Sequence, residues 1–118
     1  MPPKKISLVQ HQFAFLLDVA KLIEHAKDRG FMVTGGELYR TQDQQEIYYK
    51  AGKSKTLDSN HTRRLAIDLH FFLGGNLCDA KEIEPVGMFW EGLSPLNRWG
   101  GRFKGLVDAV HFERNVTA

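Results

Sequence analysis

The sequence predicts an α+β fold in which a small, mainly antiparallel sheet packs against two or three helices. One observation is an apolar stripe at helical spacing over residues 13–26. The other is a set of short apolar runs at residues 31–34, 65–73 and 107–113, which are typical of strands. With 118 residues and 42% hydrophobic content the chain can build one core, so we expect a single domain over residues 1–118.

The first helix is predicted from its amphipathic pattern. The apolar residues expected to face the core are Phe13, Leu16, Leu17, Ala20, Ile23 and Ala26. The charged residues expected to face solvent are Asp18, Lys21, Glu24 and Lys27. Gly30 follows as a C-cap, so the helix should end there.

A strand and a second helix are expected next. Residues 31–34 are apolar and stop at two glycines, which predicts a strand. Thr41, with Gln44 three residues later, matches a capping box and predicts a helix that ends at Gly52. Residues 53–60 are polar and are predicted to form a loop.

The second half of the chain predicts a central strand, a helix and a last strand. Residues 65–73 are apolar on both faces, which is typical of a central strand. Residues 85–93 are predicted to be helical, with Phe89 and Trp90 inward. After a Trp-Gly-Gly turn, residues 107–113 are predicted to form the last strand.

Composition excludes several classes of function. The 16 Lys and Arg residues against 14 acidic ones give a formal charge of +2, too small for a nucleic-acid-binding domain. Cys78 is the single cysteine, so neither an internal disulfide nor a cysteine metal cluster can form. No signal peptide or membrane span is recognisable, so we expect synthesis in the host cytoplasm, no membrane insertion and a monomer.

Two segments carry residues suited to chemistry. Asp68 lies within an apolar strand, where a buried ionised carboxylate is costly unless a metal or a cation lies beside it. His61 precedes it at the end of the polar loop, and His111 lies in the last apolar run. Two histidines and one carboxylate form a known zinc-peptidase ligand set that leaves a fourth position for water.

The residues alone leave other assignments open. His70 lies two residues after Asp68 and therefore on the same strand face, which makes it another candidate ligand. Asp68 could instead form a structural ion pair, for which the candidate partners are Arg40, Arg63 and Arg64.

The sequence pattern alone also does not decide which carboxylate carries the proton. On a regular strand Glu113 shares a face with His111 and Asp108 does not, so alternation favours Glu113. Asp108 would serve only if the chain turns or bulges there, which Gly105 would permit.

These segments resemble a family of small zinc metallopeptidases. The family includes L-alanyl-D-glutamate endopeptidases of phage endolysins, VanY-type D,D-carboxypeptidases and D-alanyl-D-alanine dipeptidases. Its signature elements stand here as Ser59-Asn60-His61, Ala66-Ile67-Asp68-Leu69, Trp99-Gly100-Gly101 and Asp108-Ala109-Val110-His111-Phe112-Glu113. With Tyr39-Arg40-Thr41 the resemblance covers about two thirds of the chain.

The resemblance implies a role for each matching residue. His61, Asp68 and His111 resemble the zinc ligands. Asp108 is similar to the general base and acid, and on this ground it replaces Glu113 as the expected proton carrier.

The remaining matches imply supporting roles. Arg40 would steady the carbonyl oxygen as it becomes negative. Ser59 and Trp99 would lie on the substrate side, Trp99 chiefly by shaping the site wall, and Glu113 would hydrogen-bond a ligand histidine.

One position departs from the family pattern. Arg64 stands where the family commonly has glycine, so the backbone there must accept a side chain. The substitution would also bring a positive charge near the metal, where it could tune substrate choice or weaken zinc binding.

The resemblance implies a Zn2+-dependent peptidase whose partner is bacterial peptidoglycan. The expected reaction is hydrolysis of stem peptides at the L-alanyl-D-glutamate bond, by an endolysin-like enzyme of phage origin that reaches the cell envelope after release. One alternative is a D,D-carboxypeptidase or dipeptidase that acts on D-Ala-D-Ala termini. Another is a catalytically silent wall-binding or virion domain of the same fold.

Overall fold

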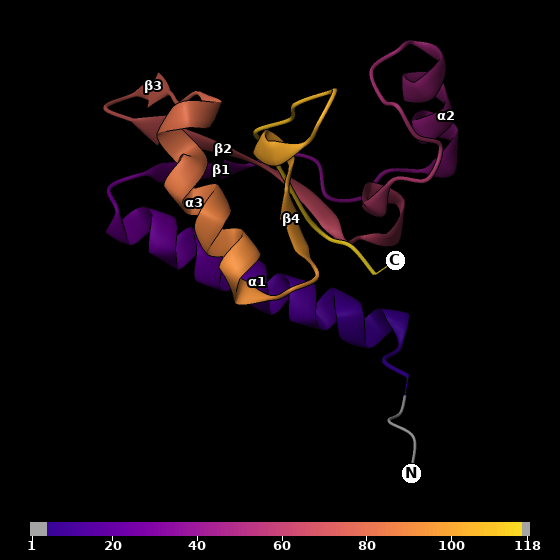
Figure 1. Ribbon diagram of the computed structural model, residues 1–118, viewed down its shortest axis with the longest axis horizontal. Coiled ribbons are helices and arrows are strands. Elements are labelled where there is room, and N and C mark those ends of the chain that lie inside the picture. The colour runs from indigo at the N-terminus through magenta and orange to yellow at the C-terminus, as the bar shows by residue number, and fades with distance from the viewer. Residues whose placement is uncertain (1–4, 117–118) are drawn as a thin grey trace.

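The predicted α+β fold is confirmed by the computed structural model, which describes residues 5–116 (Figure 1). The helices are α1 (Leu8–Asp28), α2 (Gln42–Lys50) and α3 (Ala80–Leu93). The strands are β1 (Met32–Gly35), β2 (Ala66–Leu73), β3 (Asn76–Leu77), β4 (Asn97–Trp99) and β5 (His111–Arg114). Two short 3-10 helices, η1 (Asn60–Arg63) and η2 (Gly100–Arg102), precede β2 and follow β4.

The sheet is antiparallel and β2 is its central strand, as predicted. The strand order is β1-β2-β5-β4, and β3 pairs with the end of β2. The second half of β2 pairs with β1, while its first half pairs with β5. The register with β5 sets Asp68 directly opposite His111, so strand pairing alone brings these two distant residues together.

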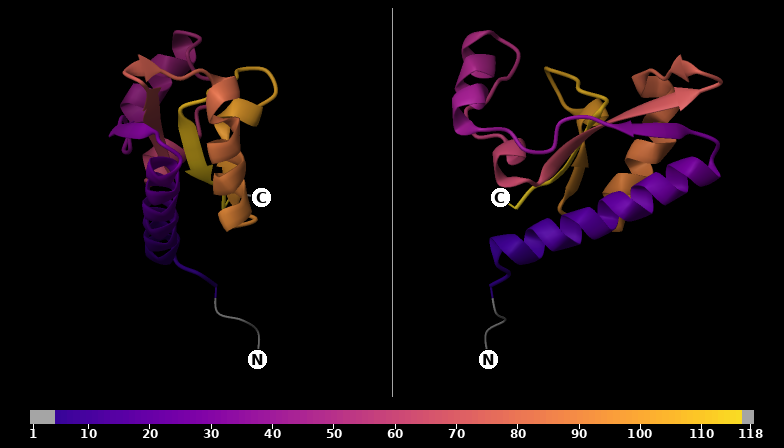
Figure 2. Two further views of the ribbon diagram at one scale, coloured as in Figure 1. Left: turned by 90° about the vertical axis from the view of Figure 1, so that its left-hand side faces the viewer. Right: turned by 180° about the vertical axis from the view of Figure 1, so that it is seen from behind.

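Helices α1 and α3 pack on the sheet and on each other, whereas α2 stands apart near the end of the sheet that carries η1 (Figures 1 and 2). An aromatic cluster joins the layers. Trp90 of α3 meets Phe15 of α1 edge-on at 5.6 Å between ring centroids and Phe112 of β5 at 5.9 Å. Phe112 in turn lies 5.7 Å from Phe71 of β2. These contacts fix the strands that carry the functional side chains.

Helix α1 forms as predicted, but of the residues predicted to face the core only Ala26 is buried. The residues that are buried are Phe15, Asp18, Val19, Leu22 and Ala26. Phe13 and Leu16 are 64% and 52% exposed. Asp18, expected in solvent, instead accepts a hydrogen bond from the Asn97 side chain at 3.1 Å. Helix α1 carries two apolar stripes, and periodicity alone does not tell which one meets the sheet.

Two element boundaries differ from the prediction for identifiable reasons. Helix α3 begins at Ala80 because Asp79 and Glu82 form a reciprocal capping box, which leaves Pro85 inside the helix. The last strand begins at His111 rather than Val107, because the His111 N–H donates to the Asp108 carbonyl in a turn.

Candidate metal centre and active site

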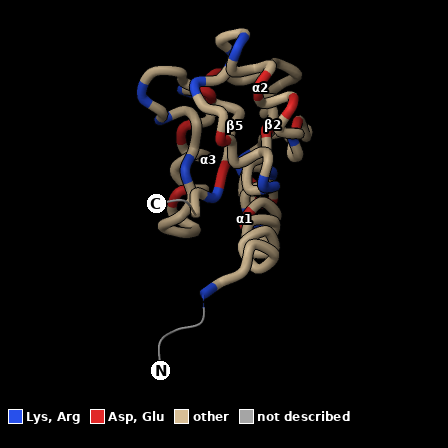
Figure 3. Tube along the Cα trace, turned by 90° about the vertical axis from the view of Figure 1, so that its right-hand side faces the viewer, with Lys and Arg blue, Asp and Glu red and all other residues tan. Residues whose placement is uncertain are grey.

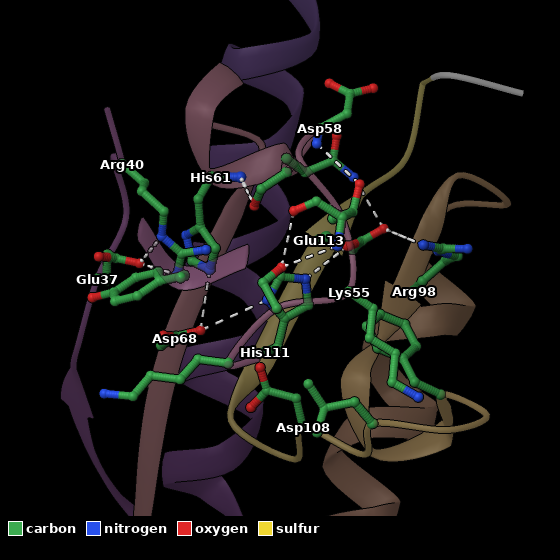
Figure 4. Close-up of a pocket in the computed structure, with 18 of the residues that line it drawn as sticks. Glu37, Arg40, Lys55, Asp58, His61, Asp68, Arg98, Asp108, His111 and Glu113 are labelled. Carbon is green, nitrogen blue, oxygen red and sulfur yellow. Dashed lines mark hydrogen bonds and ion pairs between the residues drawn. The ribbon is translucent and has the colours of Figure 1, made fainter. Parts of the chain in front are cut away.

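Three side chains from separate elements converge at the junction of η1, β2 and β5 (Figure 4). His61 Nε2 lies 3.3 Å from Asp68 Oδ1, and His111 Nδ1 lies 3.7 Å from the same oxygen. One ligand atom from each residue falls within 4.8 Å of the others. This geometry fits a group of side chains that could hold one metal ion.

The surroundings of the Asp68 carboxylate indicate whether a metal ion would fit this group of side chains. Oδ1 of Asp68 is buried and has no hydrogen-bond partner among the described residues, since neither imidazole approaches it with hydrogen-bond geometry. A buried carboxylate oxygen without a partner is unfavourable, and a cation bound there would satisfy it. Two of the arginines considered as ion-pair partners of Asp68 bind other carboxylates, since Arg40 pairs with Glu37 and Arg63 pairs with Asp58. The donor set and the unsatisfied oxygen both fit a divalent metal such as zinc.

Each imidazole is oriented by a hydrogen bond on its other nitrogen. His61 Nδ1 donates to the Leu38 carbonyl at 3.0 Å, because a carbonyl can only accept. His111 Nε2 donates to Glu113 Oε1 at 2.7 Å. These bonds turn Nε2 of His61 and Nδ1 of His111 toward Asp68, as expected for metal-ligating histidines.

Glu113 is itself held on three sides. It is 4% exposed, and its Oε2 accepts from Asn60 Nδ2 at 3.0 Å and from Arg98 Nε at 2.9 Å. Burial alone would raise the pKa of Glu113, but His111 and Arg98 hold it below its usual range. A carboxylate that stays ionised fixes the orientation of His111.

In the metal-free site the charges of the neighbouring side chains shift one another's pKa values. Burial would lower the pKa of His111, but the carboxylates of Asp68 and Glu113 outweigh it and raise this pKa to about 9. For Asp68, burial opposes ionisation, yet the neighbouring imidazoles hold its pKa well below the ordinary value. In the absence of metal, the His111 imidazole is therefore doubly protonated and positively charged. A bound cation would have to displace one of these two protons.

Asp108 reaches the same cleft from the turn before β5 (Figure 4). Its backbone N–H donates to the Gly100 carbonyl at 2.9 Å, and a Cβ at Gly100 would lie 2.0 Å from the Asp108 carbonyl oxygen. Glycine is therefore required for this close approach. Burial raises the pKa of Asp108, and the charge of Asp68 adds to the effect, while His111 opposes it. A carboxyl group with a raised pKa is suited to accept and return a proton near neutral pH.

Trp99 does not reach this cleft, which departs from the expected substrate-side role. Its side chain is 2% exposed and its indole N–H donates to the Ala109 carbonyl at 2.8 Å. A Cβ at Gly87 or Gly101 would lie 2.2 or 2.1 Å from the ring. Trp99 is thus clamped between two glycines and supports the turn that carries Asp108.

Arg40 lines the cleft, but its donors are partly occupied. It pairs with Glu37 and donates to Gln45 Oε1 at 2.8 Å, and its guanidinium lies over the Tyr48 ring at 4.7 Å. Its backbone N–H donates to the His61 carbonyl at 3.2 Å, which ties this segment to the candidate metal ligands. Arg40 is therefore a rigidly held positive charge beside the site.

Ser59 and Arg64 bracket η1 at its two ends. The Ser59 hydroxyl caps η1 by accepting from the His61 N–H at 3.2 Å, and the residue also lines the cleft. Arg64 has φ 57° and ψ 36°, the left-handed conformation that favours glycine. Its guanidinium lies 4.3 Å from the Tyr39 ring centroid and does not line the cleft, so the expected positive charge at the metal is absent.

His70 stands apart from the converging group. It lies opposite Thr34 of β1, farther along β2 than Asp68, and it is not among the three residues whose ligand atoms meet.

The cleft around these side chains is open and has a volume of about 780 Å3. Sequence reasoning missed several residues that line it, including Glu37, Asn60 and Arg98. It also missed three lysines on the rim, Lys53, Lys55 and Lys104. Asn60 fills the variable position of the Ser59-Asn60-His61 element, and the other positions lie outside the family motifs. Asn60 and Arg98 reach the site through Glu113, which is 53 and 15 residues away in the chain.

Comparison with known proteins identifies the family. A family model described as D-alanyl-D-alanine carboxypeptidase matches residues 52–114, more than half of the chain. The chain belongs to this peptidase family. As a member of this family, the protein is a hydrolase. It is a metallopeptidase that acts on peptidoglycan. The matched segment contains His61, Asp68, Asp108 and His111.

Structural comparison gives the same fold for this family member. The crystal structure of Serratia marcescens L-Ala D-Glu endopeptidase ChiX superposes with a TM-score of 0.66 at 23% identity. The match covers 84% of this chain and 79% of that one. No curated protein sequence matches the chain. Within residues 5–116, no helix has the length and apolar character needed to cross a membrane.

Proposed function

We propose that the chain is a zinc peptidase that cuts peptidoglycan stem peptides, most specifically the bond between L-alanine and D-glutamate. His61, Asp68 and His111 would hold the metal, and Asp108 would carry the proton. The observation behind this proposal is the convergence of three ligand atoms within 4.8 Å around a buried Asp68 oxygen without a hydrogen-bond partner among the described residues.

The chain's own residues supply most of the chemistry. When bound, zinc supplies a Lewis acid that acidifies water and polarises the scissile carbonyl. Asp108 takes the proton from the attacking water and returns it to the leaving amine, a role that its raised pKa favours. Glu113 keeps the His111 ring in one orientation throughout, because its carboxylate accepts from Nε2.

Arg40 and Ser59 act on the substrate in this proposal. The Arg40 guanidinium, fixed by Glu37 and Gln45, provides a preorganised positive charge for the carbonyl oxygen as negative charge develops there. Ser59 lines the same cleft and positions the peptide beside the metal. A preorganised charge of this kind commonly lowers a barrier by about 2–4 kcal/mol.

The rim lysines support a substrate with free carboxylates. Within residues 5–116, Lys53, Lys55 and Lys104 line the cleft and none lies within ion-pair distance of a carboxylate. D-Glutamate in a stem peptide bears a free carboxylate beside the scissile bond, which these ammonium groups could bind. The similarity to an L-Ala D-Glu endopeptidase points to the same bond.

A second candidate reaction is removal of a terminal D-alanine. The description of the matching family model favours it, and the C-terminal carboxylate of that substrate would also suit the rim lysines. The two reactions differ in their products, because an endopeptidase releases the stem after L-alanine and a carboxypeptidase releases only D-alanine.

Digestion of intact pentapeptide muropeptides followed by mass spectrometry tests the proposed bond. We expect products that retain L-alanine on the sugar and release the rest of the stem. Release of D-alanine alone would contradict the endopeptidase proposal and favour the carboxypeptidase. Unchanged muropeptides with a zinc-loaded protein would instead favour the catalytically silent wall-binding or virion domain.

We further propose that the enzyme acts as an endolysin-like protein of phage origin, made in the host cytoplasm and released to the cell envelope. The peptidoglycan chemistry of the matching family supports this setting. Loss of turbidity of outer-membrane-permeabilised cells, together with no loss for intact cells, is the expected result. No loss of turbidity of the permeabilised cells would contradict the proposed role in lysis.

A further inference from the structure

Helix α1 bears a second apolar stripe that nothing in the described chain covers. Its members are exposed by 39% to 71%, and they are Ile6, Val9, Phe13, Leu16, Leu17 and Ile23, with the exposed Ala20 among them. At 100° per residue the positions from Val9 to Ile23 fall within one third of the helix circumference, and Ile6 lies in the segment just before the helix. The buried set of Phe15, Val19 and Leu22 lies on the opposite side. The stripe is thus an outward-facing surface rather than the edge of the core.

The surroundings of the stripe leave it open to a partner. Helix α1 runs along the margin of the molecule, with α3 and the sheet on its inner side only (Figures 1 and 2). Between Lys5 and Asp18 the chain carries no charged residue, and α1 is correspondingly free of charge colouring along this half (Figure 3). Contiguous apolar patches of this kind on soluble domains commonly mark interaction sites.

We propose that the stripe binds the same stripe of a second copy, with the two α1 helices antiparallel across a two-fold axis. Two pairs of stripe residues within the helix lie symmetrically about the point between Ala14 and Phe15, whereas Leu17 would face Gln12 of the other copy. The segment that leads into α1, which carries Ile6, then lies beside the end of the partner helix that carries Ile23. By the same register Val9 faces Ala20, and Phe13 faces Leu16. An isologous interface requires this self-complementarity, and an arbitrary patch does not have it.

Charge and area agree with this arrangement. The same register brings the segment before α1, which carries Lys5, toward the end of the partner helix that carries Glu24, at both ends of the interface. Side chains of this size carry roughly 150–250 Å2 each when aromatic and somewhat less when aliphatic, so the stripe exposes on the order of 600 Å2 per copy. Two copies would bury about 1,200 Å2, the lower bound for a stable protein interface.

A membrane surface is a poorer match for the stripe. Helices that lie on membranes carry Lys and Arg on the polar face, where they meet anionic lipid. The charges of α1 beside the stripe are mixed, with Lys21 and Lys27 next to Glu24 and Asp28. Lys27 and Glu24 lie 3.9 Å apart and offset each other.

Dimerisation would leave the peptidase site open. None of the residues that line the cleft belongs to α1. The proposal is therefore independent of the proposed function, and a dimer-breaking variant should keep the activity of each site. The proposed dimer differs from the monomer expected from the sequence.

Light scattering coupled to size-exclusion chromatography over a concentration series tests the dimer. The wild type should approach twice the 13.5 kDa chain mass as concentration rises. Phe13→Glu should raise the dissociation constant roughly a hundredfold or more, since both copies lose an aromatic anchor and bury a charge. Leu77→Glu, a matched change at a 62% exposed leucine of β3, should dimerise like the wild type. Circular dichroism should show that both variants are folded.

Engineered disulfides test the register. In a Cys78→Ser background, the double variant Val9→Cys with Ala20→Cys should form a covalent dimer in which the two copies cross-link twice. The double variant Gln10→Cys with Lys21→Cys, shifted to the flank of the stripe, should cross-link far more slowly. Equal cross-linking of the two pairs would overturn the antiparallel register.

A wild type that stays monomeric up to its solubility limit would overturn the proposal. If that monomer also bound vesicles of phosphatidylglycerol, and Phe13→Glu did not, the stripe would be a membrane-binding surface instead.

Discussion

Asp68 owes its position to a strand register, and its neighbours owe their orientation to single hydrogen bonds. The pairing of β2 with β5 sets Asp68 opposite His111, and the Leu38 carbonyl turns His61 toward both. Each functional side chain is thus fixed by a contact outside the cleft. At this scale, small changes in the supporting partners should alter metal affinity without altering the fold.

Arg64 offers a test of backbone strain next to the site. It is the one non-glycine residue with positive φ in the described part of the chain. We expect Arg64→Gly to be more stable than Arg64→Ala by roughly 1 kcal/mol, because alanine keeps the cost of the left-handed conformation while both variants lose the contact with Tyr39. Urea denaturation of the two variants measures the difference.

The same pair of variants checks the placement of the Arg64 side chain. Peptidase activity at saturating zinc should match that of the wild type in both, because the guanidinium does not line the cleft. Equal stability of the two variants would show that residue 64 leaves the left-handed region.

The sequence motifs predicted most of the residues that meet in the cleft, but not the contacts that hold those residues in place. Strand alternation favoured Glu113 over Asp108, yet Asp108 lies in a turn built on Gly100, where alternation does not apply. Asn60 and Arg98 hold Glu113 through contacts that span 53 and 15 residues. No local pattern encodes contacts between segments so far apart.

At the scale of elements, start signals proved more informative than apolar runs. The Ser7 and Asp79 capping boxes mark the observed beginnings of α1 and α3, whereas the apolar pattern placed the start of α3 at Pro85. For α1, two apolar stripes compete, and only the packing against α3 and the sheet decides between Phe13 and Phe15. Tertiary contacts of this kind cannot be deduced from the periodicity of one helix.

Two glycines of α3 should respond in opposite directions to the same substitution. Gly87→Ala should destabilise the protein by about 1–3 kcal/mol, because the new methyl group would overlap the Trp99 ring. Gly92→Ala, where the space is open, should stabilise it by up to about 1 kcal/mol. Thermal unfolding of both variants measures these shifts.

The Gly87→Ala variant should also lose activity, because Trp99 supports the turn that carries Asp108. If both alanine variants were equally stable, Trp99 would not be seated on α3 as described.

At the scale of the whole molecule, charge coupling in the site predicts how the metal-free protein responds to pH. The pKa of His111 rises on folding from 6.5 to about 9, so its stabilising contribution is complete below pH 6.5 and is lost as pH rises through 9. Metal-free protein should therefore lose roughly 2–3 kcal/mol of unfolding free energy over this interval. Urea titrations in chelator at several pH values measure it.

At acidic pH the free energy of unfolding changes in the opposite direction and falls as pH decreases. The pKa values of Asp68 and Glu113 are lowered on folding, so their contribution is present above the ordinary carboxyl range and falls away as pH drops below it. A His111→Gln variant should show no decline between pH 6.5 and 9. A decline of the same size in that variant would assign the alkaline effect to another group.

Metal content measured together with turnover tests the central claim most directly, for wild type, His61→Ala and Asp108→Asn purified in parallel. We expect one zinc ion per chain in the wild type and in Asp108→Asn, and little in His61→Ala. Turnover should fall by roughly 10²–10⁴ in Asp108→Asn although its metal is retained. Full activity of the wild type after zinc has been stripped, or wild-type turnover in Asp108→Asn, would contradict it.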